Sequence, residues 1–277
     1  MEKNIPIDVV GMLPLIDQQL MALLRSLEPA DWQKPTVAKL WSVKDVAAHL
    51  LDGNIRVLSM LRDGFRGENP SINSYQDLLD FLNGLNADWV KAMKRVSPEM
   101  LILLHELTGP LYCRYYASLD PFDQAGFAVD WAGESESKNW MHIAREYTEK
   151  FLHQQQIRDA VGKPGIMTRE IFYPFIDIFM RALPHTFRHT AAARGTCVQL
   201  AVTGGIGGSW FLTRQNNSWD LVKETSYQPA TIVELAPDDA WKLFSKSIRA
   251  EQIRDKINIQ GDPQLAAIAL GMVSVMA

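Results

Sequence analysis

The chain has 277 residues, and its 28 Lys and Arg against 32 Asp and Glu give a formal net charge of -4 at pH 7. A chain of this length has room for two modest domains, and its lack of a basic excess argues against nucleic acid and anionic membranes as partners. No apolar run approaches the roughly 20 residues of a membrane span, and the N-terminal residues do not read as a signal peptide. We therefore expect a cytoplasmic protein that binds small molecules; the sequence does not indicate its oligomeric state.

Apolar residues at helical spacing predict four long helices in the first part of the chain. Ser42 and Ser74 stand where N-caps are needed, and Gly162 follows the last of these helices as a stop signal. Long helices with apolar stripes predict an antiparallel four-helix bundle. The predicted helices cover residues 7–26, 42–62, 75–96 and 138–161.

The aromatic-rich segment 105–137 shows little periodicity, and we expect a long connection there. Connections of this length in compact domains are often functional. We interpret the segment as a roof over a site, with His105 and Arg114 as candidate substrate contacts.

After Pro164 the pattern changes to short β-rich runs between turn sequences. One helix is predicted over 171–183, and later helices begin at Pro237 and Asp262. The sequence thus predicts a helical bundle over residues 1–163, followed by a small α+β domain over 164–277 with an antiparallel or mixed sheet. The predicted strands are three short runs within 197–224, then 231–235 and 256–259.

Two predicted helices carry polar stripes that include histidines. Residues four, seven and eleven apart share one face of a helix, and this spacing joins His142, Glu146, Glu149, His153 and Gln156. The second helix repeats the pattern with Asp45, His49, Asp52 and Arg56. Solvated faces would explain both stripes, but facing helices in a bundle can also direct such groups to one point in the core.

The set His49, Glu149 and His153 suits a divalent ion, because two imidazoles and one carboxylate leave a coordination position for water or substrate. Asp52 is a candidate acceptor that could orient His49. His142 and Glu146 have the same four-residue spacing and form an alternative metal pair. Spacing alone does not choose between the two.

Three motifs occur in the order known from one family: a Trp-x-x-Pro-Thr loop, a Trp-Ser-Val-x-Asp-Val-x-x-His helix start, and a Glu-x-x-x-His that precedes Ile-Arg-Asp-Ala. "DWQKPTVAKLWSVKDVAAHLLDGN" and, some ninety residues later, "EKFLHQQQIRDAVG" resemble the metal-binding N-terminal domain of mycothiol-dependent maleylpyruvate isomerases, a branch of the DinB-like four-helix bundles. The resemblance covers roughly residues 10–163 and implies that the metal triad is His49, Glu149 and His153. "IVELAPDDAWKLFSKS" and "GDPQLAAIALGMVSVM" look like the α+β domain related to sterol carrier protein type 2.

The resemblance implies an enzyme in which a divalent metal, zinc or alternatively nickel, activates a low-molecular-weight thiol for addition to an electrophilic substrate. Addition followed by expulsion gives isomerisation, whereas addition alone gives an S-transferase. No residue is assigned as general acid or base. The alternatives are a metal-dependent hydrolase and a non-catalytic, metal-stabilised carrier or sensor of a small apolar ligand.

Overall fold

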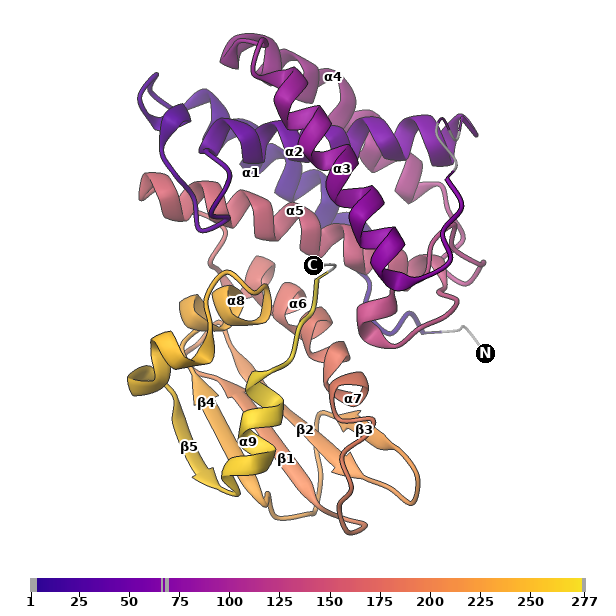
Figure 1. The fold of residues 1–277 in the computed structure, drawn as a ribbon, viewed down its shortest axis with the longest axis vertical. Coiled ribbons are helices and arrows are strands. Elements are labelled where there is room, and N and C mark those ends of the chain that lie inside the picture. The colour runs from indigo at the N-terminus through magenta and orange to yellow at the C-terminus, as the bar shows by residue number, and fades with distance from the viewer. Residues whose placement is uncertain (1–3, 66, 68–69, 276–277) are drawn as a thin grey trace. The chain divides into compact units, whose positions relative to one another are not determined.

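A computed structural model describes residues 4–65, 67 and 70–275 of the chain. These residues divide into two compact units, whose elements are labelled in Figure 1. The helical unit holds the described residues up to Gly126 together with Lys138–Ile166, and the α+β unit holds Phe127–Ser137 together with the described residues from Met167 onwards. The break after Ile166 lies close to the predicted boundary at residues 163–164.

Five α-helices make up most of the described helical unit. Four of them match the helices predicted from the sequence, and a π-helical stretch, Val57–Arg62, extends the second to its predicted end. The helices are α1 (Leu13–Arg25), α2 (Val43–Arg56), α3 (Tyr75–Met93), α4 (Pro98–Ala117) and α5 (Asn139–Val161).

Local sequence sets the ends of these helices. Ser42 and Ser74 each open a capping box, in which the serine side chain accepts a hydrogen bond from the backbone N–H three residues later. Gly162 ends α5 in the left-handed conformation, with φ of 68°, which glycine adopts without a steric cost. The predicted caps and the predicted stop are confirmed.

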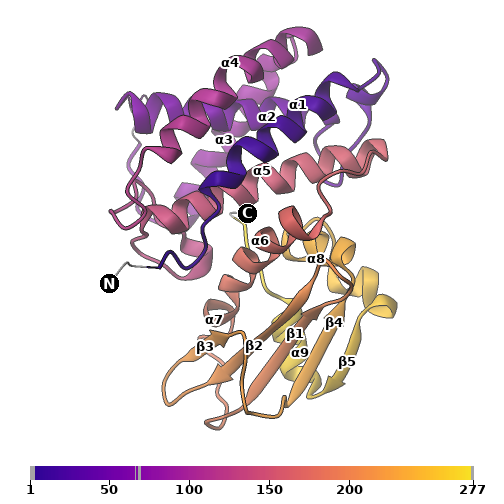
Figure 2. The ribbon, with the colours of Figure 1, turned by 180° about the vertical axis from the view of Figure 1, so that it is seen from behind.

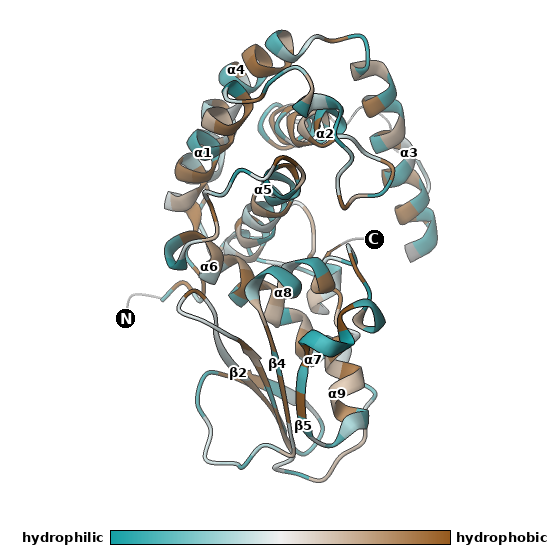
Figure 3. Ribbon diagram, turned by 90° about the vertical axis from the view of Figure 1, so that its left-hand side faces the viewer, coloured by the Kyte–Doolittle hydropathy of each residue, from teal (hydrophilic) through white to brown (hydrophobic). Residues whose placement is uncertain are grey.

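The four-helix bundle is formed by α1, α2, α4 and α5. Both α4 and α5 lie beside α1 and α2, whereas α3 packs against α2 on the outside of the bundle (Figure 3). A shared apolar core between these helices holds the arrangement together, because burial removes its side chains from water. Its members include Leu20, Leu24, Val46, Leu50, Leu101 and Ile157.

Helix α4 corrects the prediction of a long connection over 105–137, because residues 98–117 are helical. The sequence pattern did not predict this helix, because its own apolar residues are spread around its whole circumference and form no single stripe. Pro110 also lies inside it. His105 is fully buried, with Nε2 2.9 Å from the carbonyl oxygen of Ala47. Arg114 is exposed on α4. His105 is therefore a core histidine that solvent does not reach.

The α+β unit contains a mixed sheet of five strands, which agrees with the predicted antiparallel or mixed sheet, and the strand order is β3-β2-β1-β4-β5. β1 pairs with β4 in parallel, and the other neighbours are antiparallel. Helix α9 (Pro263–Leu270) packs on β1, β4 and β5 and lies across one face of the sheet (Figures 1 and 2). The strands are β1 (Cys197–Val202), β2 (Gly208–Arg214), β3 (Trp219–Val222), β4 (Thr231–Leu235) and β5 (Asn258–Gly261).

Aromatic side chains fill much of the core of the α+β unit. Helices α6 (Arg169–Phe179) and α8 (Pro237–Phe244) bury Phe172, Phe175, Phe179, Trp241 and Phe244, and α7 (Leu183–Thr186) follows α6 after a 3-10 turn. Aromatic side chains remove large apolar areas from water, which stabilises a small unit. Among the described residues of the whole chain, none of the helices is both long and apolar enough to span a bilayer.

Candidate metal centre

The predicted ligands from α2 and α5 come together in the helical unit. His49 projects from α2, and Glu149 and His153 project from α5, one helical turn apart. One ligand atom from each residue can be chosen so that all three lie within 4.8 Å of one another. Among the described residues, no other group of three or more His, Cys, Asp or Glu side chains has this spacing.

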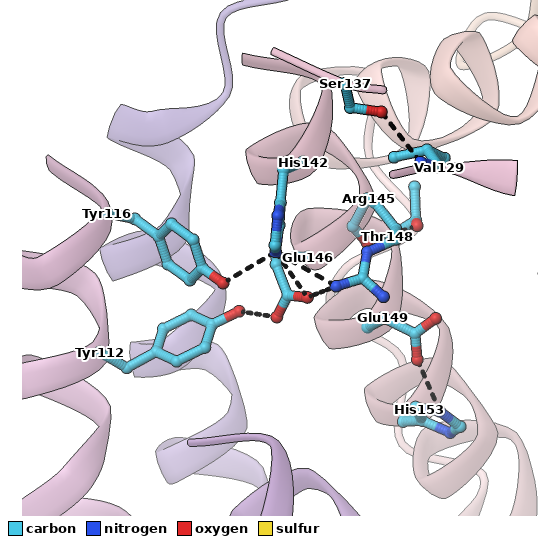
Figure 4. A network of polar contacts seen from close by, with 10 residues as sticks. All are labelled: Tyr112, Tyr116, Val129, Ser137, His142, Arg145, Glu146, Thr148, Glu149 and His153. Carbon is cyan, nitrogen blue, oxygen red and sulfur yellow. Dashed lines mark hydrogen bonds and ion pairs between the residues drawn. The ribbon is translucent and has the colours of Figure 1, made fainter. Parts of the chain in front are cut away.

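His153 is held by partners on both of its ring nitrogens. Its Nε2 lies 3.2 Å from Glu149 Oε2, as Figure 4 shows, and its Nδ1 lies 2.9 Å from Gln156 Oε1. An amide oxygen is an acceptor, so the Gln156 contact places the proton of a neutral imidazole on Nδ1. A metal ion bound between Nε2 and Glu149 would take the place of the contact that these two groups make with each other.

His49 presents a buried nitrogen without a partner. Its Nδ1 has no hydrogen-bond partner among the described residues. Burial lowers the pKa of His49 well below its ordinary value, and the positive charges of His153, Arg56 and Lys150 add to this effect. A neutral imidazole offers a nitrogen lone pair to a cation, and a buried ring nitrogen without a partner is a costly arrangement.

Glu149 supplies the negative charge of the site. Burial by itself would raise its pKa, but the hydrogen bond and charge of His153 and the charge of Arg145 hold the pKa below its ordinary value. The carboxylate is therefore ionised at neutral pH. Two imidazoles and one carboxylate match the donor set of three-ligand zinc sites with an open position.

Trp41 forms a wall of the site. Its ring centroid lies 4.8 Å from that of His49 and 6.4 Å from that of His153, and the two histidine rings meet edge to face at 4.6 Å. Trp41 precedes the Ser42 cap of α2, so the capping sequence that starts the helix also places the tryptophan beside His49.

Asp52 does not bond to His49 in the structure. Its Oδ2 lies 3.0 Å from Arg56 Nε in an ion pair whose angles fall short of a hydrogen bond. Burial raises the pKa of Asp52, and the charge of Arg56 partly offsets the increase. The role of Asp52 as an acceptor for His49 stays a prediction without a contact to support it.

The alternative pair, His142 and Glu146, lies about two turns earlier on α5 and is surrounded by protein donors (Figure 4). Glu146 Oε1 accepts a hydrogen bond from Arg145, and its Oε2 accepts one of 2.7 Å from the Tyr112 hydroxyl. His142 Nε2 lies 3.3 Å from the Tyr116 hydroxyl and 3.6 Å from Glu146 Oε1.

These donors decide the chemistry of the pair. Burial would raise the pKa of Glu146, but the Arg145 charge and the hydrogen bonds from His142 and Tyr112 hold it well below its usual range. The Arg145 guanidinium compensates the charge of the carboxylate and the Tyr112 hydroxyl hydrogen-bonds to it, so it does not need a metal. The geometry therefore favours the His49 set over the His142 pair.

The sequence pattern assigned no role to Gln156, which contacts His153, or to Tyr112, which hydrogen-bonds to Glu146. Gln156 follows His153 by three residues, and this spacing could have identified it as a partner for the imidazole. Tyr112 comes from α4, which was not recognised as a helix, so its meeting with Glu146 depends on the tertiary fold.

Comparison with known proteins agrees with this architecture. The family model of the mycothiol maleylpyruvate isomerase N-terminal domain matches residues 13–158, more than half of the chain. No curated protein gives a significant match. Two crystal structures of mycothiol-dependent maleylpyruvate isomerase, one of them a mutant, each cover 91% of this chain and of their own, with TM-scores of 0.55 and identities of 10% and 11%.

Part of the chain is also similar to sterol carrier protein 2 structures. The sterol carrier protein 2 like 2 from Aedes aegypti aligns over 35% of this chain and 95% of its own, with 13% identity and a TM-score of 0.28. The isomerase structures share the fold of this chain, and the family match covers all three candidate ligands. The chain belongs to the mycothiol maleylpyruvate isomerase N-terminal domain family.

Proposed function

We propose that this protein is a metal- and thiol-dependent enzyme, an isomerase or an S-transferase, with zinc held by His49, Glu149 and His153. The observation that carries the proposal is the convergence of three ligand atoms within 4.8 Å on two facing helices. The donor set leaves a coordination position for a further ligand. The thiol is supported by family membership and by the similarity to structures described as mycothiol-dependent.

Each residue of the site has a distinct part in this proposal. Zinc, when bound, would lower the pKa of a coordinated thiol and so favour the nucleophilic thiolate. His49 stays neutral because burial lowers its pKa, and the Glu149 carboxylate offsets the charge of the cation. Gln156 orients the His153 ring, and Trp41 limits the access of water from one side.

The thiolate would add to an activated double bond of the substrate. Addition turns this double bond into a single bond, about which the substrate can rotate, and expulsion of the thiolate then yields the other geometric isomer. Retention of the new carbon–sulfur bond instead yields an S-conjugate. Both outcomes use the same metal-binding residues. Whether the protein acts as an isomerase or as a transferase therefore depends on whether the substrate adduct expels the thiolate.

Metal content tests the ligand set. Elemental analysis should find about one zinc per chain in the wild type and in His142→Ala, and strongly reduced zinc in His49→Ala and His153→Ala. His142→Ala is the matched control because it removes a buried histidine from the same helix without touching the proposed set. Equal zinc in all four proteins, or loss in His142→Ala alone, would contradict the assignment.

Turnover tests the chemistry. The zinc-loaded protein should convert an α,β-unsaturated carboxylate in the presence of mycothiol, bacillithiol or glutathione, with isomers followed by NMR and S-conjugates by mass spectrometry. The apo protein and His153→Ala should lose this activity. Zinc-dependent hydrolysis of an ester without thiol would favour the hydrolase alternative, and zinc binding without any turnover would favour the carrier or sensor.

A further inference from the structure

The outward face of α4 carries a continuous apolar stripe. Met100, Leu103, Leu107 and Leu111 are 48%, 44%, 59% and 36% exposed, and their spacing of three and four residues places them on one side of the helix. Large apolar side chains are common singly on protein surfaces, but a row of four on one helix forms a patch.

The opposite side of the same helix is the buried side. Leu101, His105, Tyr112 and Tyr116 pack inward, where α4 lies beside α1 and α2. A helix that is apolar on both sides is expected where both sides are covered. Within the helical unit, the described residues cover only the inward side of α4.

Charged residues stand at both ends of the stripe in a self-complementary order. Glu99 precedes Met100 and Arg114 follows Leu111, and both are exposed. The midpoint between Glu99 and Arg114 falls in the middle of the stripe, and helical geometry places both charges on the same flank of it. A two-fold axis near residue 106 would therefore bring Glu99 of one chain to Arg114 of an antiparallel second chain.

The same axis matches the apolar residues. It sets Met100 near Leu111 and Leu103 near Leu107 of the second chain, because the midpoints of these pairs lie within about one residue of the axis, so each large side chain meets another. Symmetric two-fold interfaces require a patch that is complementary to itself in this way. The partner that fits this surface is therefore the α4 helix of a second copy of the chain, running in the opposite direction.

We propose that the outward face of α4 binds a second copy of this chain as an antiparallel helix pair. The patch is small for a permanent dimer, so the association is reversible and concentration-dependent. The stripe supplies the contact and the charged ends set the direction and register.

Sedimentation velocity of the full-length chain, from a few to several hundred micromolar, tests this. The wild type should shift from monomer to dimer, and Leu107→Glu should raise the dimer dissociation constant at least tenfold. Leu40→Glu is the matched control, because Leu40 is 93% exposed and lies outside the stripe. Circular dichroism should show the same helix content in all variants.

Charge reversal tests the direction of the pair. Glu99→Arg and Arg114→Glu should each weaken the dimer, because each sets like charges opposite one another. The double variant should recover dimerisation, since the pair is restored with its signs exchanged. A wild type that stays monomeric at several hundred micromolar, dimerisation of Leu107→Glu equal to that of the wild type, or a double variant as weak as the singles would each overturn the proposal.

Discussion

The buried histidine of α4 provides a quantitative test of the helical bundle. Burial lowers the pKa of His105 from 6.5 to about 4, with the Lys150 charge as a second cause and the Ala47 carbonyl as a partial offset. The folded pKa is therefore below the unfolded one. Between these two values the unfolded chain binds a proton that the folded chain does not, so stability is present above about pH 6.5 and is lost as the pH falls toward 4.

The magnitude follows from the two pKa values. A decrease from 6.5 to about 4, at about 1.4 kcal/mol per pH unit, corresponds to about 3 kcal/mol of unfolding free energy. His105→Gln cannot titrate but keeps a donor for the Ala47 carbonyl. The wild type should therefore lose about 3 kcal/mol more than His105→Gln between pH 7 and pH 4.

Urea unfolding followed by far-ultraviolet circular dichroism measures this difference. The protein is kept in a chelator, so that metal binding does not add its own pH dependence, and is compared at pH 7, 5.5 and 4. His189→Gln replaces an exposed histidine and controls for the loss of a histidine as such. Identical pH dependence of the wild type and His105→Gln would refute the reasoning.

Two further predictions concern the site and the sheet. Gln156→Leu should weaken zinc affinity about tenfold in competition with a chelator, because His153 loses the acceptor that orients it, while Gln155→Leu on the same helix should not; equal affinities would contradict this role. Gly207→Ala should lower the urea stability of the α+β unit by about 2 kcal/mol or more, since a Cβ there would lie 1.9 Å from the Val202 carbonyl oxygen. Gly205→Ala, where a Cβ meets no atom within 4 Å, should be near neutral, and equal losses would exclude a steric cause.

Features that depend on near neighbours in the chain could be predicted from the sequence. The Ser42 and Ser74 caps and the Gly162 stop act within four residues, so their local chemistry is visible in the sequence. The change of pattern after residue 164 likewise predicted the α+β unit and its mixed sheet. Helical spacing predicts which side chains share a face, so both the His49 set and the His142 pair could be named, and the resemblance to the isomerase family favoured the first.

Helix α4 shows where this reasoning ends. Its apolar residues point in all directions, so periodicity could not reveal that it, in place of α3, completes the bundle. Without that helix, the sequence could not show that the Tyr112 hydroxyl hydrogen-bonds to Glu146, whose charge Arg145 compensates.

The sequence by itself determined four of the five described helices of the helical unit, the Ser42 and Ser74 caps, the Gly162 stop and the two candidate histidine stripes, because these follow from side chains a few residues apart. Only the tertiary structure shows which members of the two stripes lie together. It brings His49 to Glu149 and His153 across about one hundred residues of chain, and it fills the surroundings of Glu146 with donors from α4 and α5. These contacts depend on how whole helices pack against one another. The free energy of packing depends on the entire core, so it cannot be read from a local sequence pattern.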